Sequence, residues 1–174
     1  MRRAILICSL ALIVIWTVIR GLAEIRFERG CEGHLKRAAD ANTIELAIQE
    51  TQTAVDYMEA QGLTAGYTSV IYTTPDEDIG FWHQNIKASL EELKSVSPEA
   101  TPLVKSNVLL KLRETLLDHG QHGDTVTAPT GISVYPFNLP LALMLVAGFV
   151  GSLAFILAMR QGWWAPYRRQ RRHY

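Results

Sequence analysis

The chain is poor in cysteine, with only Cys8 and Cys31 among its 174 residues. Cys8 lies inside an apolar run, where we expect it to act as a small packing residue. Cys31 is then alone in the polar part of the chain, which excludes a framework of intramolecular disulfides. A lone cysteine in an oxidising compartment can join two copies of a chain, so Cys31 predicts either an intermolecular disulfide or a free thiol.

Acidic residues are missing from both ends of the chain. All 17 Asp and Glu lie between Glu24 and Asp124, whereas residues 1–3 and 160–174 contain seven Arg and no acid. Segment 21–137 has nine Lys or Arg against those 17 acids, so its net charge is about −8. Because phosphate neutralisation needs clustered Lys and Arg, this balance excludes nucleic acid as the expected partner of the middle segment.

Catalytic sequence frames are missing as well. The chain has no GxSxG nucleophile turn, no phosphate-binding loop and no HExxH pair, and its Ser, His and Asp residues show no triad spacing. We therefore expect a protein that is not an enzyme and that needs no cofactor.

Charge is absent from two long stretches. Leu139–Met159 is 21 residues without a charge, which as a helix covers ~31 Å, about the hydrocarbon thickness of a bilayer. Residues 4–19 are uncharged too, and residues 21–23 can extend that run past Arg20. The sequence therefore predicts two transmembrane helices, with membrane lipid as a partner of both.

The arginines beside these stretches predict their orientation. The two tails offer seven Lys or Arg, against four just after the first apolar segment, which favours cytoplasmic termini. The first segment is either an uncleaved anchor or a signal peptide cleaved after the Gly21-x-Ala23 pattern. Both alternatives place the middle of the chain outside the cytoplasm, and the expected localisation is an inner cell membrane.

The resulting layout has five regions. They are a cytoplasmic N-terminus (1–3), a transmembrane helix (4–23), an extracytoplasmic helical domain (24–137), a second transmembrane helix (138–159) and an Arg-rich cytoplasmic tail (160–174).

Hydrophobic periodicity in the middle domain predicts about three antiparallel amphipathic helices, over residues 34–61, 74–96 and 101–119. A helical extension of the first span, broken near Gly30, leads into them. Two further segments can form a small β-hairpin or mini-sheet: residues 67–73, rich in β-branched side chains, and residues 125–135, centred on a Pro-Gly turn. The expected fold class is mostly α.

Two polar or aromatic clusters could bind a ligand. His119 and His122, with Asp118 and Asp124, supply the atom types that zinc takes, although a polar helix end accounts for them without a metal. The second cluster could line a pocket for an apolar or aromatic ligand, or could simply belong to the core. Its members are Tyr72, Phe81, Trp82 and His83.

Two more sets belong to the second span and its tail. Small residues that let helices approach closely in lipid are Ala147, Gly148, Gly151 and Ser152. We expect them to pack against either the first span or another protein. Residues that could attract lipid headgroups, or only anchor the topology, are Arg168, Arg169, Arg171 and Arg172.

This layout of span, outer helices and span resembles the input half of transmembrane chemoreceptors and sensor kinases in architecture, without any motif of those families. Only about 15 residues follow the second span, so we expect no output domain on this chain. The first hypothesis is a non-enzymatic accessory subunit that presents its acidic domain to a membrane or envelope protein, or to another copy of itself. The alternatives are a ligand-binding sensor element that signals through a partner, and a metal-dependent enzyme using His119 and His122.

Overall fold

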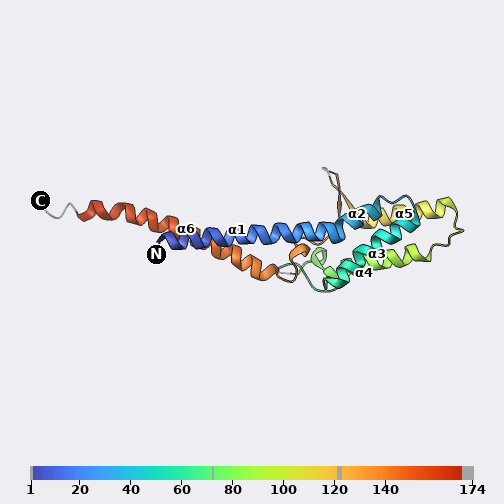
Figure 1. Cartoon of the computed structure of the whole chain (residues 1–174), viewed down its shortest axis with the longest axis horizontal. Helices are drawn as coiled ribbons and strands as arrows, with labels where there is room; N and C mark the ends of the chain where they lie inside the picture. The colour runs from blue at the N-terminus through green and yellow to red at the C-terminus, as the bar shows by residue number, and fades with distance from the viewer. Residues whose placement is uncertain (1, 72, 121–122, 170–174) are drawn as a thin grey trace. The chain divides into compact units, whose positions relative to one another are not determined.

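The computed structural model describes residues 2–71, 73–120 and 123–169. The structure is mostly helical (75%) with one small antiparallel sheet and two long apolar helices, so the predicted fold class is confirmed at this level. The chain divides into two compact units (Figure 1). We call Met1–Gly21 with Leu139–Tyr174 the apolar unit, and Leu22–Asn138 the helical unit.

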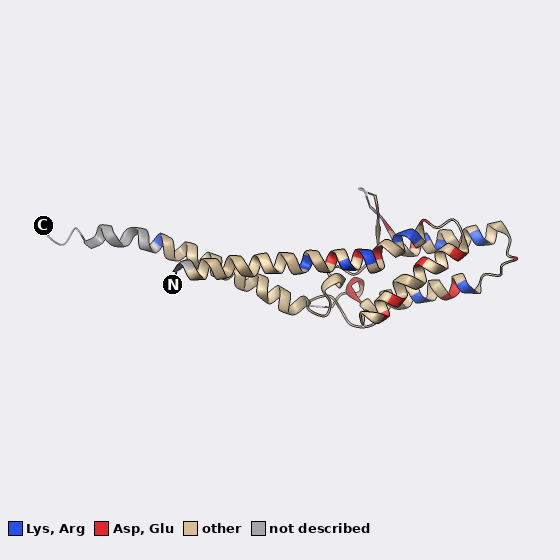
Figure 2. Cartoon of the chain, in the orientation of Figure 1, with Lys and Arg blue, Asp and Glu red and all other residues tan. Residues whose placement is uncertain are grey.

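Helices α1 (Arg2–Phe27) and α6 (Asn138–Arg169) supply the apolar unit. Each is long and apolar enough to cross a membrane, by length and composition. Large apolar side chains along them, such as Val14 and Phe149, remain exposed. Figure 2 shows that Asp, Glu, Lys and Arg gather on the helical unit, whereas residues 4–19 of α1 and 138–159 of α6 carry no charge.

Inside the apolar unit, small residues of α6 lie against α1. Ser9 is only 3% exposed, and the hydroxyl of Ser152 donates a hydrogen bond to the Ser9 hydroxyl at 3.3 Å. A Cβ at Gly148 would lie 2.8 Å from a side-chain carbon of Ile13, and one at Gly151 would lie 3.0 Å from the Ser9 Cβ. The close approach therefore requires the absence of a side chain at Gly148. The fourth member of the predicted stripe, Ala147, is exposed.

The helical unit is a bundle of four helices. They are α2 (Gly33–Ala39), α3 (Ile44–Ala60), α4 (Ile79–Ser95) and α5 (Pro102–Leu116). Helix α2 packs against α3 and α5, and α4 packs against the same two, which closes the bundle. Successive helices alternate in direction (Figure 1). The fully buried side chains of the core include Cys31, Leu35, Met58, Ile79, Ile86, Leu90, Leu93 and Leu116.

The prediction of one helix over residues 34–61 is wrong, because the chain turns between Asp40 and Thr43 and forms α2 and α3 instead. The Thr43 side chain accepts a hydrogen bond from the backbone N–H of Leu46 at 3.3 Å and so caps the start of α3. Hydrophobic periodicity continues across this turn, which hid the break. The bundle consequently has four helices, where three were predicted.

The predicted helix start at Thr74 is also wrong. Pro75–Glu77 forms a 3₁₀ turn, and α4 begins at Ile79 with Asp78 as its cap. The residues around Asp78 form backbone hydrogen bonds with the segment that begins at Gly66. This tertiary contact prevents residues 74–78 from continuing as part of α4.

Two further boundaries differ from the prediction. Helix α5 ends at Leu116, and the next residues form strand β1 (Leu117–Gly120) rather than a last helical turn. Strand β1 pairs with β2 (Gly123–Val126), in the register Leu117↔Val126, Asp118↔Thr125, His119↔Asp124 and Gly120↔Gly123. A hairpin therefore exists, but its strands lie before the Pro-Gly turn, and Ile132–Val134 beyond that turn is a 3₁₀ helix.

Near Gly30 the chain forms a π-helix, η1 (Glu28–Glu32), which continues α1 into α2 without the predicted break. A Cβ on Gly30 would lie within 3.0 Å of three atoms of the Tyr57 ring. That ring is held in place by an edge-on contact with Phe27, at 6.4 Å between centroids. The wider turn of a π-helix and a missing side chain thus let α3 pack closely against this segment.

We predict that Gly30→Ala destabilises the helical unit, because the added methyl group collides with the Tyr57 ring. The expected loss is about 1–3 kcal/mol, typical of overpacking a core. Thermal unfolding followed by circular dichroism in mild detergent measures it. Gly21→Ala is the control, since a Cβ there meets no atom within 4 Å. Equal unfolding temperatures for the two variants would contradict the packing assigned to Gly30.

Candidate functional site

The segment between α3 and α4 folds back on itself and exposes a short acidic turn. The Thr68 N–H donates to the Glu77 carbonyl at 3.1 Å, and the Ile79 N–H donates to the Gly66 carbonyl at 2.9 Å. Tyr67 and Asp78 form an antiparallel bridge between these bonds. The pairing holds the turn Pro75–Glu77 at the start of α4, and Pro75 and Asp76 of this turn line one cleft together with Thr115 of α5.

The opposite side is built by the end of α5 and the segment after the hairpin. The Thr127 N–H donates to the carbonyl of Leu116 at 3.0 Å, and the Thr127 hydroxyl donates to the carbonyl of Thr115 at 3.2 Å. These bonds fix residues 127–130 beside α5, and Pro129 is buried there.

A cleft of about 420 Å³ lies between the two sides. This volume is within the range of small-molecule and peptide-anchor pockets. Its walls consist of Pro75, Asp76, Asp78, Phe81, Trp82, Asn85, Thr115, Asp118, Thr127, Ala128, Pro129 and Thr130.

A second hollow of about 280 Å³ adjoins the cleft. It is lined by Tyr67, Thr73, Thr74, Pro75, Asp78 and Phe81, so the two hollows share three wall residues. The shared Phe81 is 67% exposed, and Tyr67 in the second hollow is 43% exposed. An exposed aromatic ring therefore stands between two concave surfaces.

The charge in the cleft has one sign. Asp76, Asp78 and Asp118 contribute carboxylates, and none of the lining residues is Lys, Arg or His. Asp78 caps α4 by accepting the Phe81 N–H at 3.0 Å. Across the described residues, Asp76 and Asp118 have no hydrogen bond or ion pair, so both carboxylates can bind a group from another molecule.

Trp82 connects this cleft to the core. The residue is 7% exposed, and its ring lies 6.4 Å from that of Phe27. Its indole nitrogen Nε1 is buried and finds no acceptor within the described part of the chain. Such an unpaired buried donor is uncommon in folded proteins.

The predicted aromatic cluster is therefore divided by the structure. Phe81 and Trp82 line the cleft, whereas His83 faces the other way, with Nε2 3.7 Å from a carboxylate oxygen of Glu59. Tyr72 lies outside the described residues. Asp118 also lines the cleft, although it was predicted as a metal ligand. Asp76 and the 127–130 segment were not predicted, because the sequence assigned the first to a helix start and the second to a hairpin turn.

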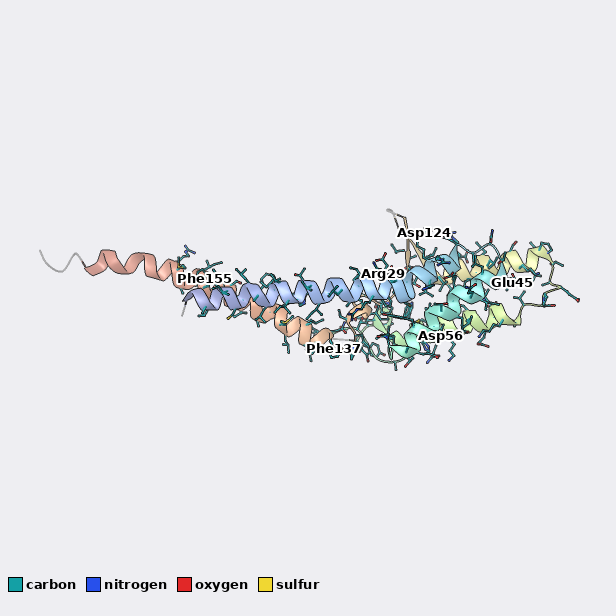
Figure 3. The ribbon with its side chains drawn as sticks, in the orientation of Figure 1. Arg29, Glu45, Asp56, Asp124, Phe137 and Phe155 are labelled. Carbon is teal, nitrogen blue, oxygen red and sulfur yellow. The ribbon has the colours of Figure 1, made fainter. Side chains whose placement is uncertain are left out.

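The predicted metal ligands come from the hairpin. His122 and the side chain of His119 lie outside what the structure describes. The register pairs Asp118 with Thr125 and His119 with Asp124, so Asp118 and Asp124 lie on opposite faces of the hairpin. Asp124 bonds to Arg113 at 2.9 Å (Figure 3 labels it), while Asp118 lines the cleft. Among the described residues, no three His, Cys, Asp or Glu are grouped to hold a metal ion.

The thiol of Cys31 is fully buried in the core between η1 and α3. Burial, and to a smaller extent the charge of Glu32, raises the pKa of the Cys31 thiol to about 12. The intermolecular disulfide stays a prediction, and it would require this part of the bundle to open. Of the tail arginines, Arg168 and Arg169 end α6 with side chains outside the description, and Arg171 and Arg172 lie beyond it.

A second polar cluster joins α2 to α3. The Glu50 side chain is 4% exposed and bonds to Nδ1 of His34 at 2.6 Å and to the guanidinium of Arg37. A buried carboxylate requires such partners, since an unpaired one would be strongly unfavourable. We interpret this cluster as a structural link between the two helices.

No family model matches this chain, and no curated protein and no solved structure is similar to it.

His83 makes the stability of the bundle pH-dependent. Its pKa lies below the ordinary value because burial disfavours the charged ring and Lys87 repels it, while Glu59 partly offsets both. Below pH about 6.5, the ordinary histidine pKa, the unfolded chain binds a proton that the folded chain does not. Stability from His83 is therefore complete above that pH and falls as the pH drops toward the pKa of the folded state.

We predict that the unfolding temperature of His83→Gln falls less than that of the wild type between pH about 7.5 and about 5.5. The neutral amide removes the proton uptake, while the Glu59–Lys87 ion pair stays in both proteins. Circular dichroism in one mild detergent at both pH values measures the difference. Identical losses in the two proteins would show that His83 does not set this dependence.

Proposed function

We propose that this protein is a membrane-anchored, non-enzymatic interaction subunit. In this proposal α1 and α6 cross an inner cell membrane, both termini are cytoplasmic, and the helical unit lies outside the cytoplasm. The apolar length of the two helices and the arginines at both ends of the chain support this placement.

The observation that carries the proposal is the surface around Phe81. An aromatic side chain that is 67% exposed, with a hollow on each side, has the form of an anchor for a protein partner. Interface energy is concentrated in such aromatic anchors and the pockets beside them. We define the Phe81 surface as the walls of the two hollows, and propose that a separate polypeptide of the membrane or envelope docks there.

The same cleft bears on the sensor hypothesis. Its volume suits a small ligand, but its walls are largely polar and it opens to solvent beside a second hollow. A pocket that binds a small ligand usually surrounds most of the ligand's surface. An extended partner that occupies both hollows at once fits this shape better.

We predict that a protease added outside intact spheroplasts cleaves the helical unit and spares an epitope tag attached after Tyr174. The arginine-rich end should stay in the cytoplasm, because the rule that keeps basic flanks inside applies to it. Immunoblotting with tags at Tyr174 and within residues 96–101 measures both. Loss of the C-terminal tag with survival of the internal one would reverse the proposed topology.

We predict that a photoreactive phenylalanine analogue at Phe81 crosslinks one discrete partner in the native membrane. The control carries the analogue at Leu103, which is 70% exposed but sits at the opposite end of the α4–α5 pair. The Phe81 adduct should be absent from the Leu103 sample, because the hollows surround only Phe81. Mass spectrometry identifies the adduct.

Three results of that experiment would contradict the proposed docking: no adduct from Phe81, the same adducts from both positions, or an adduct formed only with a second copy of this chain.

A further inference from the structure

The Phe81 surface also indicates the chemistry of its partner. This step rests on the proposed function and adds to it. We propose that the docked polypeptide inserts an arginine or lysine side chain into the cleft, next to an apolar residue that occupies the second hollow.

The first argument is charge complementarity. The cleft has carboxylates from Asp76, Asp78 and Asp118, without any basic lining residue. Asp76 and Asp118 come from different elements and have no partner within the described ranges, so their negative charges face the same space uncompensated. A cation placed between them gains from both, and charge complementarity of this kind selects partners and raises association rates.

The second argument is that the nearby bases of the helical unit are already occupied. Lys87 bonds to Glu59 at 2.8 Å, Lys111 to Glu92 at 2.7 Å, and Arg113 to both Asp40 and Asp124. These basic side chains stabilise contacts between helices and do not reach the cleft. The missing positive charge must then come from another molecule.

The third argument is the aromatic content of the walls. Phe81 and Trp82 flank the carboxylates, and a guanidinium or ammonium group is attracted to the face of an aromatic ring.

A bound metal ion is the main rival, and the geometry disfavours it. The carboxylates of the cleft do not form a group of three that could hold a metal ion among the described residues. The second hollow is lined by Tyr67, Phe81 and Pro75, and these walls suit an apolar side chain better than a cation. A partner with a basic residue beside an apolar one would fill the cleft and the second hollow at the same time.

The test uses the full chain in its native membrane, with the crosslinker at Phe81 and the double variant Asp76→Asn, Asp118→Asn. Both aspartates are exposed and unpaired, so the variant should keep the wild-type unfolding temperature. We expect the yield of the partner adduct to fall roughly tenfold, because two charges that face the partner cation are removed.

The control is Glu45→Gln, Glu99→Gln, which removes two exposed charges elsewhere on the helical unit (Figure 3 labels Glu45). This variant removes the same two negative charges' worth of net charge as the double aspartate variant, and its adduct yield should match the wild type. Fragment sequencing of the adduct should place the crosslinked residue within a few positions of an arginine or lysine.

The outcomes separate the two proposals. An adduct that forms equally well without Asp76 and Asp118, or a crosslinked segment free of basic residues, overturns the charge recognition and leaves docking at Phe81 standing. If millimolar Ca²⁺ abolishes the adduct and NaCl at the same ionic strength does not, the carboxylates bind a metal ion instead. The absence of any adduct from Phe81 overturns the docking itself.

Discussion

The contact on which the helical unit depends is the packing of Phe27 against two aromatic side chains of the bundle. Its ring lies 6.4 Å from both Tyr57 on α3 and Trp82 on α4. Aromatic pairs at such separations contribute beyond the area that they bury. Because Phe27 is the last residue of α1, this contact fixes where the chain enters the bundle.

Several other features follow from that entry point. The π-helix η1 and the bare Gly30 bring the chain close enough for Tyr57 to reach Phe27. Trp82 faces the core, and Phe81, the preceding residue about 100° around the helix, is exposed at the surface. The core contact and the exposed ring are therefore two consequences of one helix orientation.

The sequence predicted best where burial alone decides the structure. The apolar residues spaced three and four apart along α4 are all buried, from Ile79 through Trp82, Ile86 and Leu90 to Leu93. The prediction from sequence failed where backbone hydrogen bonds between distant segments compete with a local helix signal. Thr74-Pro75 is typical of a helix start, yet the hydrogen bond from Ile79 to Gly66 forms beside Asp78, whose backbone is extended, and Asp78 becomes the cap of α4. No periodicity encodes that bond.

The residues of the candidate site divide in the same way, into those that the sequence identified and those that it did not. Phe81 and Trp82 could be singled out from the sequence because neighbouring aromatic residues are conspicuous near the start of a helix. Asp118 was singled out too, but as a metal ligand with Asp124, whereas the hairpin register separates the two. Residues 127–130 could not be found, since their role depends on the bonds from Thr127 to the end of α5.

The acidic composition of the helical unit acquires a specific meaning from this arrangement. A net charge of about −8 keeps a domain soluble, and any exposed carboxylate would serve that purpose. Solubility does not require that carboxylates from separate elements line one concave surface. Nor does it require an exposed phenylalanine at the edge of that surface, which opposes solubility. Both features are accounted for by the proposed docking of a partner that presents a basic and an apolar side chain.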